Sequence, residues 1–318
     1  MYNAKGEKEM YPLKMTPVYK DYIWGGDNLN KKYGKKSPYE ITAESWEVAS
    51  HKNGESVVEN GKYQGMTIKQ LVGELKEKLL GDRVYGCDKF PLLIKFIDAK
   101  DNLSIQVHPD DEYAFKNENC EMGKTEMWYV MHAEEGAGLI YGFAKELSKE
   151  EFKNAINDNS LLSYTNFVEC KKGDCFFISA GTLHAIGKGL IIAEIQQNSD
   201  TTYRVYDYDR RDSQGNPRPL HIDKAIDVTN LGLSANCDAG TVDNGIIAKC
   251  DYFTTEKITV NTEKIYEVDR SRFETLIVCE GEVSINDVPF KMGETALIPA
   301  YIGQVKIEGK GVLLRSYT

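Results

Sequence analysis

The chain has 318 residues, of which 41% are hydrophobic and 28% are charged, as expected for a folded globular protein. Its formal net charge of −10 argues against a general binder of nucleic acids or membrane surfaces, but a local positive pocket could still take a phosphorylated small molecule. The seven cysteines form no C-x-x-C pair, which indicates reduced thiols. The first residues lack the apolar core of a signal peptide, and no run of about 18 apolar residues occurs, so we expect a cytoplasmic protein with no membrane partner.

In chain order, the first predicted strands lie in ESWEVAS (44–50) and in the two segments after it, which contain the turn-forming pairs Asn53-Gly54 and Asn60-Gly61. A helix is predicted near 67–80, because TIKQ matches a capping box and an apolar stripe of helical period follows it. The next segment, FPLLIKFIDAKDNLSIQVHP (90–109), predicts two consecutive strands.

Two further strands are predicted in EMWYVM (126–131) and GAGLIYGF (136–143). A second helix is expected near 148–162, where SKEE forms another capping box. Strand patterns return between 166 and 210, and a short helix is expected near 221–230.

The segment SANCDAGTVDNG (234–245) has the composition of a linker. We therefore expect a mainly β protein with a larger domain at 1–233, which carries the two helical segments, and a smaller β domain at 246–318.

The chain contains one candidate internal repeat. GDCFFISAGTLH (173–184) aligns without a gap on GETALIPAYIGQ (293–304), and TEMWYV (125–130) aligns on FETLIV (273–278). A duplicated β module would explain both matches, with Gln304 where the first module has His184. Chance similarity between apolar strands explains them equally well at this level.

A candidate metal site comes from four polar residues in apolar surroundings. Gln106 and His108 are two apart in a β-branched run, so on a strand their side chains share a face. Glu126 opens the next apolar run, and His184 follows a glycine-marked turn. Two imidazoles, a carboxylate and an amide oxygen form a mixed site that Zn²⁺ accepts. The alternative for each residue alone is an ordinary hydrogen bond near a turn.

Two nearby residues are candidates for proton transfer. Lys124 would share the face of Glu126 on a strand and so point into the same pocket, or else it is a solvated lysine in the turn after Gly123. Glu194 interrupts the apolar run LIIAEIQ, which makes it either a buried base with a perturbed pKa or a residue on the wet face of an edge strand.

LSIQVHPDD, GKTEMWYV, the turn before His184 and SDTTYRVYD together resemble the type I mannose-6-phosphate isomerases, a zinc-dependent branch of the cupin superfamily. VYKDYIWGG and ESWEVASH are similar to the bacterial short form of this family, so the likeness spans roughly residues 11–230. It implies a jelly-roll β-barrel catalytic domain, a smaller cupin-like domain without metal ligands, and one Zn²⁺ per chain. The second cupin motif departs from the pattern at Ser179, where proline is usual, and an insertion separates His108 from Glu126.

The resemblance assigns the metal ligands to Gln106, His108, Glu126 and His184, and an active-site role to Arg204. By itself Arg204 could equally form a strand-edge ion pair with a neighbouring aspartate. The implied reaction interconverts mannose 6-phosphate and fructose 6-phosphate through an enediol, with Lys124 or Glu194 moving the proton and Ser104 near the phosphate. The alternative is a sugar-phosphate-binding cupin that regulates without turnover. A hexose 6-phosphate is the expected partner, without nucleic acid, in a monomer or homodimer.

Overall fold

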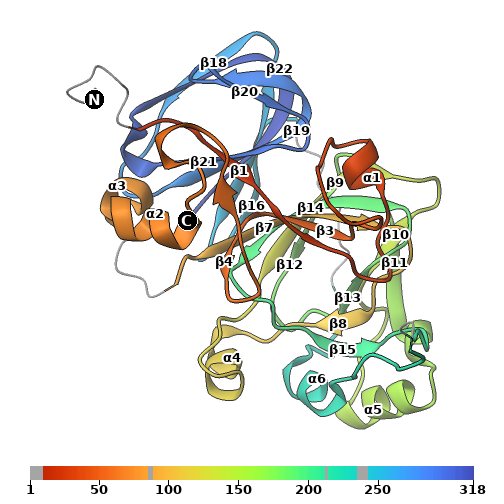
Figure 1. Cartoon of the computed structure of the whole chain (residues 1–318). Helices are drawn as coiled ribbons and strands as arrows, with labels where there is room; N and C mark the ends of the chain where they lie inside the picture. The colour runs from red at the N-terminus through yellow and green to blue at the C-terminus, as the bar shows by residue number, and fades with distance from the viewer. Residues whose placement is uncertain (1–9, 85–88, 212–213, 235–242) are drawn as a thin grey trace.

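The computed structural model describes residues 10–84, 89–211, 214–234 and 243–318, and within these ranges the chain is built mainly of β-strands (Figure 1). Three large sheets carry the fold, and a two-stranded hairpin of β4 (Ser50–His51) and β5 (Gly54–Glu55) accompanies them. The mainly β architecture expected from the sequence is confirmed.

A six-stranded sheet lies between two apolar cores, with the strand order β12-β9-β14-β7-β3-β2. Its strands are β2 (Val18–Lys20), β3 (Glu44–Val48), β7 (Leu92–Ala99), β9 (Glu126–Ala133), β12 (Cys175–Ile178) and β14 (Leu190–Gln197). Side chains alternate between the two cores: in β9, Met127 and Tyr129 pack into one core, whereas Trp128 and Val130 pack into the other. This alternation places Glu126 on the face of Trp128.

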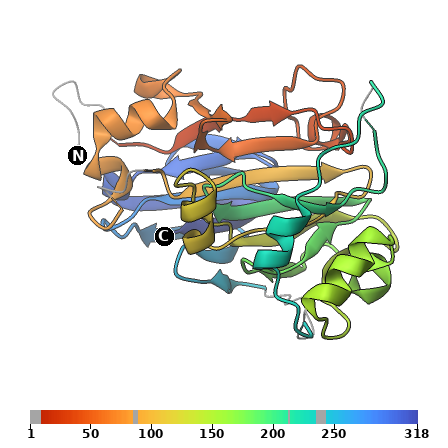
Figure 2. The same ribbon diagram turned by 90° about the horizontal axis from the view of Figure 1, so that it is seen from below.

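A five-stranded sheet packs against that second face, in the order β11-β10-β13-β8-β15. Its strands are β8 (Ile105–Val107), β10 (Gly138–Phe143), β11 (Thr165–Glu169), β13 (His184–Ile186) and β15 (Tyr203–Tyr206). The helices α5 (Lys149–Asn157) and α6 (Ile222–Val228) pack on it through Phe152 and Ala225, and lie side by side in Figures 1 and 2. The insertion after β8 forms the short helix α4 (Asp111–Asn117).

A nine-stranded sheet covers the other face of the six-stranded sheet, through the largest core cluster. Its strands are β1 (Leu13–Thr16), β6 (Val57–Val58), β16 (Gly245–Lys249), β17 (Thr254–Val260), β18 (Glu263–Glu267), β19 (Glu274–Ile285), β20 (Val288–Lys291), β21 (Thr295–Ile298) and β22 (Gln304–Tyr317). Two of them, β1 and β6, come from the N-terminal part of the chain. Residues 235–242 of the expected linker lie outside the described residues, and the division into domains at 1–233 and 246–318 stays a prediction.

Both predicted capping boxes are present, with the Thr67 and Ser148 side chains accepting the backbone N–H groups of Gln70 and Glu151. The first helical segment is nevertheless divided into α2 (Ile68–Leu75) and α3 (Glu77–Leu80), because Lys76 has a left-handed φ of 51°. The second predicted helical segment, near 148–162, consists of two helices. The first is α5, which ends at Asn157, and the second is the 3-10 helix η2 (Leu161–Tyr164).

The chain turns back at Asn60-Gly61, with an antiparallel bridge between Val57 and Thr67, but not as a tight two-residue hairpin. These residues lead into the 3-10 helix η1 (Gly61–Tyr63), where the Tyr63 ring stacks on that of Tyr11 at a centroid distance of 5.9 Å. The remaining short helices are α1 (Asn28–Lys31) and η3 (Ala300–Ile302). None of the helices in the described ranges has the length and apolar character that a membrane-spanning helix requires.

Candidate metal centre and the adjoining cavity

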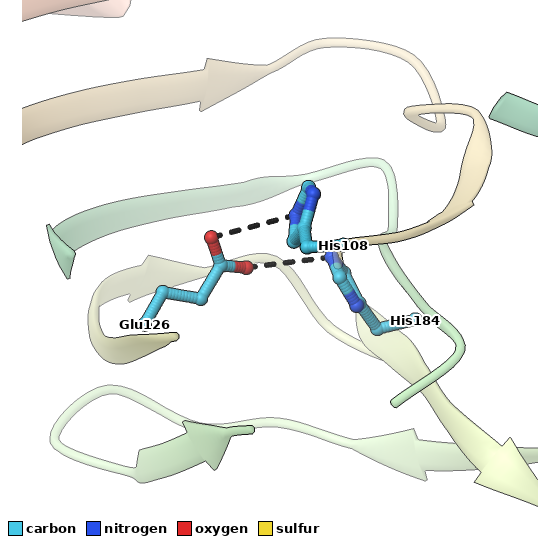
Figure 3. Close-up of side chains that lie close together, drawn as sticks. All are labelled: His108, Glu126 and His184. Atoms are coloured by element: carbon cyan, nitrogen blue, oxygen red, sulfur yellow. Dashed lines mark ion pairs between the residues drawn. The ribbon is translucent and has the colours of Figure 1, made fainter. Parts of the chain in front are cut away.

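Three of the predicted metal ligands, His108, Glu126 and His184, lie together between the six-stranded and five-stranded sheets. The two oxygens of Glu126 face different imidazoles, with Oε2 3.6 Å from His108 Nε2 and Oε1 3.3 Å from His184 Nε2 (Figure 3). Each residue offers one ligand atom within 4.8 Å of the others. The structure therefore brings together residues that are 18 and 58 positions apart in the sequence.

Strand pairing produces this convergence. His184 is the first residue of β13 and pairs with Gln106 in β8, so His108, just beyond β8, lies beside it. Glu126 is the first residue of β9, on the facing sheet. All three ligands thus lie at strand ends, where the backbone is still fixed by the sheets.

The two imidazoles are prepared to act as neutral ligands. His108 Nδ1 lies 2.9 Å from the carbonyl oxygen of Thr201, and His184 Nδ1 lies 2.9 Å from that of Thr182. A carbonyl only accepts hydrogen bonds, so Nδ1 carries the proton and the Nε2 lone pair faces Glu126. Burial lowers the pKa of His108 to about 4, and burial lowers the pKa of His184 as well.

Glu126 is fully buried, and neither of its oxygens accepts a hydrogen bond from the described residues. Burial acts to raise its pKa, but Lys124 and the imidazoles outweigh burial and hold the pKa well below the usual range. Lys124 Nζ lies 2.8 Å from Oε2, but Oε1 has no hydrogen-bond donor among the described residues, which is costly for a buried carboxylate and which a bound divalent ion would offset. Two imidazole nitrogens and one carboxylate oxygen are a catalytic zinc set that leaves a position open, so the residues present fit a divalent metal ion.

Gln106 adjoins the same cluster, with its Nε2 3.4 Å from His184 Nε2. Rotation of the amide by half a turn would bring Oε1 to this position, because the two amide atoms exchange places. Its assignment as the fourth ligand stays a prediction.

A cavity of about 310 Å³ adjoins the cluster. Its walls contain every remaining residue that the sequence singled out: Gln106, Lys124, Glu194, Arg204 and Ser104. The complete lining is Tyr22, Trp24, Glu44, Lys95, Ile97, Leu103, Ser104, Gln106, Lys124, Ile186, Glu194, Asp200, Thr202, Arg204 and Arg218.

Charges of alternating sign cross the floor of this cavity. This charged row consists of Glu44, Lys95, Glu194, Lys124 and Glu126. Lys95 Nζ lies 3.8 Å from Glu44 Oε2 and 3.3 Å from Glu194 Oε1. Lys124 Nζ lies 3.9 Å from Glu194 Oε1 and 2.8 Å from Glu126 Oε2. The row follows the sheet order β9-β14-β7-β3, in which Glu194 and Lys95 are direct cross-strand partners.

Indole groups hold both carboxylates that flank Lys95. Trp128 Nε1 donates to Glu194 Oε2 at 2.9 Å, and Trp46 Nε1 donates to Glu44 Oε2 at 2.6 Å. Burial acts to lower the pKa of Lys95, but Glu44 and Glu194 outweigh burial and raise the pKa above the usual range. Glu194 Oε1 accepts no hydrogen bond from the described residues, which leaves an acceptor beside the cavity.

Arg204 does not form the strand-edge ion pair that was its alternative. Asp207 is bound by Arg210 and Arg218, and the latter reaches both carboxylate oxygens. Arg204 Nη1 donates to the carbonyl oxygen of Pro219 at 3.0 Å, while its buried Nε has no partner among the described residues. Burial, and then the adjacent Arg218, lower the pKa of Arg204, although a guanidinium stays charged.

Sequence reasoning missed Glu44, Lys95, Asp200 and Arg218, which all line the cavity. Lys95 carried the clearest signal, as a single lysine inside the apolar run FPLLIKFIDA, where a charge needs a partner. Glu44 and Asp200 lie in ordinary polar contexts and gave no such signal.

Known proteins resemble this chain over nearly its whole length. A family model for the catalytic domain of type I phosphomannose isomerases matches residues 12–144, and one for the cupin domain of mannose-6-phosphate isomerases matches residues 245–318. The mannose-6-phosphate isomerase ManA of Bacillus subtilis is 41% identical, over 94% of this chain and 96% of the relative. The mannose-6-phosphate isomerase of Streptococcus mutans is 37% identical, over 96% and 98%.

The crystal structure of a mannose 6-phosphate isomerase from Bacillus subtilis superposes with a TM-score of 0.86 at 38% identity, over 96% of this chain and 99% of the other. These matches confirm the cupin fold expected from the sequence. Together they show that this chain belongs to the type I phosphomannose isomerase family.

Proposed function

We propose that the chain is a zinc-dependent aldose–ketose isomerase that interconverts mannose 6-phosphate and fructose 6-phosphate through an enediol. The observation that carries the proposal is the buried His108–Glu126–His184 cluster beside a cavity with lysine, arginine and carboxylate side chains on its walls. The substrate is the one named for the relatives in Bacillus subtilis and Streptococcus mutans.

His108, Glu126 and His184 would hold one Zn²⁺ per chain, with Gln106 as the fourth ligand. When bound, the ion supplies Lewis-acid polarisation of a substrate oxygen, which makes the C–H beside the carbonyl more acidic. The carbonyl oxygens of Thr201 and Thr182 keep the imidazoles in the tautomer that presents Nε2.

Glu194 is our choice for the base that moves the proton between C2 and C1. Its Oε2 accepts from the Trp128 indole, whereas its Oε1 accepts no hydrogen bond from the described residues and lies 3.3 Å from Lys95 Nζ, on a residue that lines the cavity. Lys124, whose Nζ is 3.9 Å from Glu194 Oε1, would donate to the substrate oxygens as they gain negative charge. The hydrogen bond from Trp128 and the buried acceptor Oε1 support Glu194 over Lys124 as the base.

Arg204 would supply fixed positive charge to the enediolate, because its Nε has no protein partner among the described residues. Ser104 lines the same cavity and offers a hydroxyl donor to the phosphate. The aromatic pair Tyr22 and Trp24, with ring centroids 5.7 Å apart, also lines the cavity.

The test is a coupled assay for fructose 6-phosphate formation from mannose 6-phosphate, combined with elemental analysis. We expect about one zinc per chain, loss of activity after prolonged chelation, and recovery with Zn²⁺. H184A should lose both metal and activity. H132A should keep both, because His132 lies on β9 outside the cluster. Binding of the sugar phosphate without turnover in the zinc-loaded protein would contradict the proposal.

A further inference from the structure

The two segments that repeat in the sequence, 125–184 and 273–304, also have the same hydrogen-bond register in the backbone. Glu126 in β9 pairs with Ile178 in β12, and Glu274 in β19 pairs with Ile298 in β21, each aligned on its counterpart in the repeat. The turns before β12 and β21 also agree: Gly173 and Gly293 have φ of 95° and 89°, and each donates its N–H at 2.8 Å to a valine carbonyl of the neighbouring strand. Identical registers on both sides of a turn are strong support for a duplicated module.

This register identifies the C-terminal counterparts of the metal ligands. Glu274 stands for Glu126. Gln304 is the counterpart of His184. Gln304 pairs with Glu267 in β18, as His184 pairs with Gln106 in β8, so Glu267 is the counterpart of Gln106. Asp269, two residues after Glu267, occupies the position of His108. The C-terminal module therefore keeps the buried carboxylate of the site and has no imidazole.

The C-terminal module has a cation of the chain, Arg315, beside Glu274. In the N-terminal module, β14 flanks β9 and pairs Glu194 with Trp128. In the C-terminal module, β22 flanks β19 and pairs Arg315 with Leu276, which aligns on Trp128. Arg315 thus occupies the position of Glu194, on the same face as Glu274. The strands β19 and β22 lie in the blue part of Figure 1.

The contacts of Glu274 contrast with those of Glu126. Glu274 is fully buried, and Arg315 binds it with two parallel hydrogen bonds, Nε to Oε2 at 2.8 Å and Nη2 to Oε1. Tyr266 donates a third hydrogen bond to Oε2 at 3.1 Å. Glu126, by contrast, accepts none from the described residues. Glu126 has one close cation of the chain, Lys124, with its Nζ 2.8 Å from Oε2, whereas the Arg315 guanidinium bonds both oxygens of Glu274.

The guanidinium is also enclosed. It lies over the Tyr266 ring at 4.2 Å and near the Tyr317 ring at 5.2 Å from their centroids. Its Nη1 lies 3.5 Å from Oε2 of Glu256, whose other oxygen accepts from Tyr317 at 2.6 Å. Two aromatic faces and two carboxylates hold the group in place.

We propose that the C-terminal module carries a relict of the metal site in which the Arg315 guanidinium takes the place of the metal ion. The chain then has one external metal position, and the C-terminal module is held by its own cation whether or not metal is bound. The inference does not rest on isomerase activity.

The first test is metal stoichiometry after dialysis against excess Zn²⁺ or Mn²⁺. We expect one ion per wild-type chain, one in E274Q, and in E126Q a site that is lost or weakened by about 100-fold or more. Two ions in the wild type, one of which is lost in E274Q, would overturn the proposal. Activity enters none of these measurements, so this proposal and the isomerase proposal fail independently.

The second test is thermal unfolding of E274Q, R315M and the double variant, each with metal and after chelation. R315M leaves the buried Glu274 carboxylate without its cation, and E274Q leaves Arg315 with Glu256 alone among its carboxylate partners in the described residues, so Tm should fall by ~5 °C or more, by the same amount in both conditions. The double variant should lose less than the sum of the two. K306M is the control, because Lys306 on β22 forms only exposed pairs, with Glu263 and Glu308. Equal Tm losses for K306M and R315M, or a loss in R315M that Zn²⁺ reverses, would overturn the proposal.

Discussion

Replacement of Glu194 by glutamine tests the assignment of the base. The substitution keeps the shape of the side chain and an oxygen that can accept from the Trp128 indole, but it removes the negative charge and the basic site. Lys95 Nζ lies 3.3 Å from Glu194 Oε1, so Coulomb's law at an effective dielectric of about 20 gives about 5 kcal/mol for their attraction. Lys95 keeps Glu44, at 3.8 Å, as a second partner.

Because general-base catalysis contributes on the order of 100- to 10,000-fold, we expect kcat of E194Q to fall by that factor. KM should change much less, since the residues assigned to the metal and to the phosphate are unaltered. The coupled assay measures kcat and KM, and NMR detection of solvent deuterium in the product reports proton transfer at carbon. E169Q, on the exposed edge strand β11, is the matched control.

One result would refute this reasoning. If E194Q keeps deuterium incorporation within about 10-fold of the wild type, while K124M loses it, then Lys124 is the base and Glu194 only positions the lysines. A parallel measurement of zinc content shows whether either variant acts through the metal.

Four further predictions follow from the same contacts. E126Q should weaken metal binding by about 100-fold or more, measured by competition with a chromophoric chelator, because it removes the anionic ligand. R204K should lower kcat/KM by about 10- to 100-fold in the isomerase assay, because lysine cannot reproduce the guanidinium donors. K35M should cost about 3–5 kcal/mol in urea unfolding, because Lys35 Nζ lies 2.6 Å from the fully buried Glu47 Oε1. Burial raises the pKa of Glu47 and lowers that of Lys35, so the ionised pair opposes folding, and K35M/E47Q should recover most of the loss. S148A should cost about 1 kcal/mol in urea unfolding by removing the cap of α5, whereas S148D should be nearly neutral.

The strand patterns predicted most of the metal cluster. Q-x-H in a β-branched run fixed the shared direction of Gln106 and His108, and a carboxylate opening the apolar run at Glu126 pointed to a buried charge. Their meeting with His184 depends on the pairing of β13 with β8, which no local pattern specifies. The resemblance to a family supplied that long-range information.

Other features depended on tertiary contacts that compete with local preference. Asn60-Gly61 has the dipeptide of a tight hairpin, yet the stacking of Tyr63 on Tyr11 accompanies a 3-10 turn in its place. Lys95 lies in a strand that is apolar on both faces, so alternation could not show which core it enters. Only the sheet order places Glu44 and Glu194 on either side of it.

The charged row explains how such a polar floor can be buried. Lys95 on β7 lies between Glu44 on β3 and Glu194 on β14, and Lys124, just before β9, lies between Glu194 and Glu126, so these attractions offset part of the desolvation of each group. The row contains three carboxylates and two ammonium groups, and therefore carries one net negative charge. A divalent ion and the Arg204 guanidinium would turn this into a net charge of about +2, which matches a phosphate group of about −2. The charge of the bound metal would then offset the free energy of desolvating the phosphate, and the phosphate that of the metal. The affinity for the sugar phosphate should therefore fall when the metal is removed.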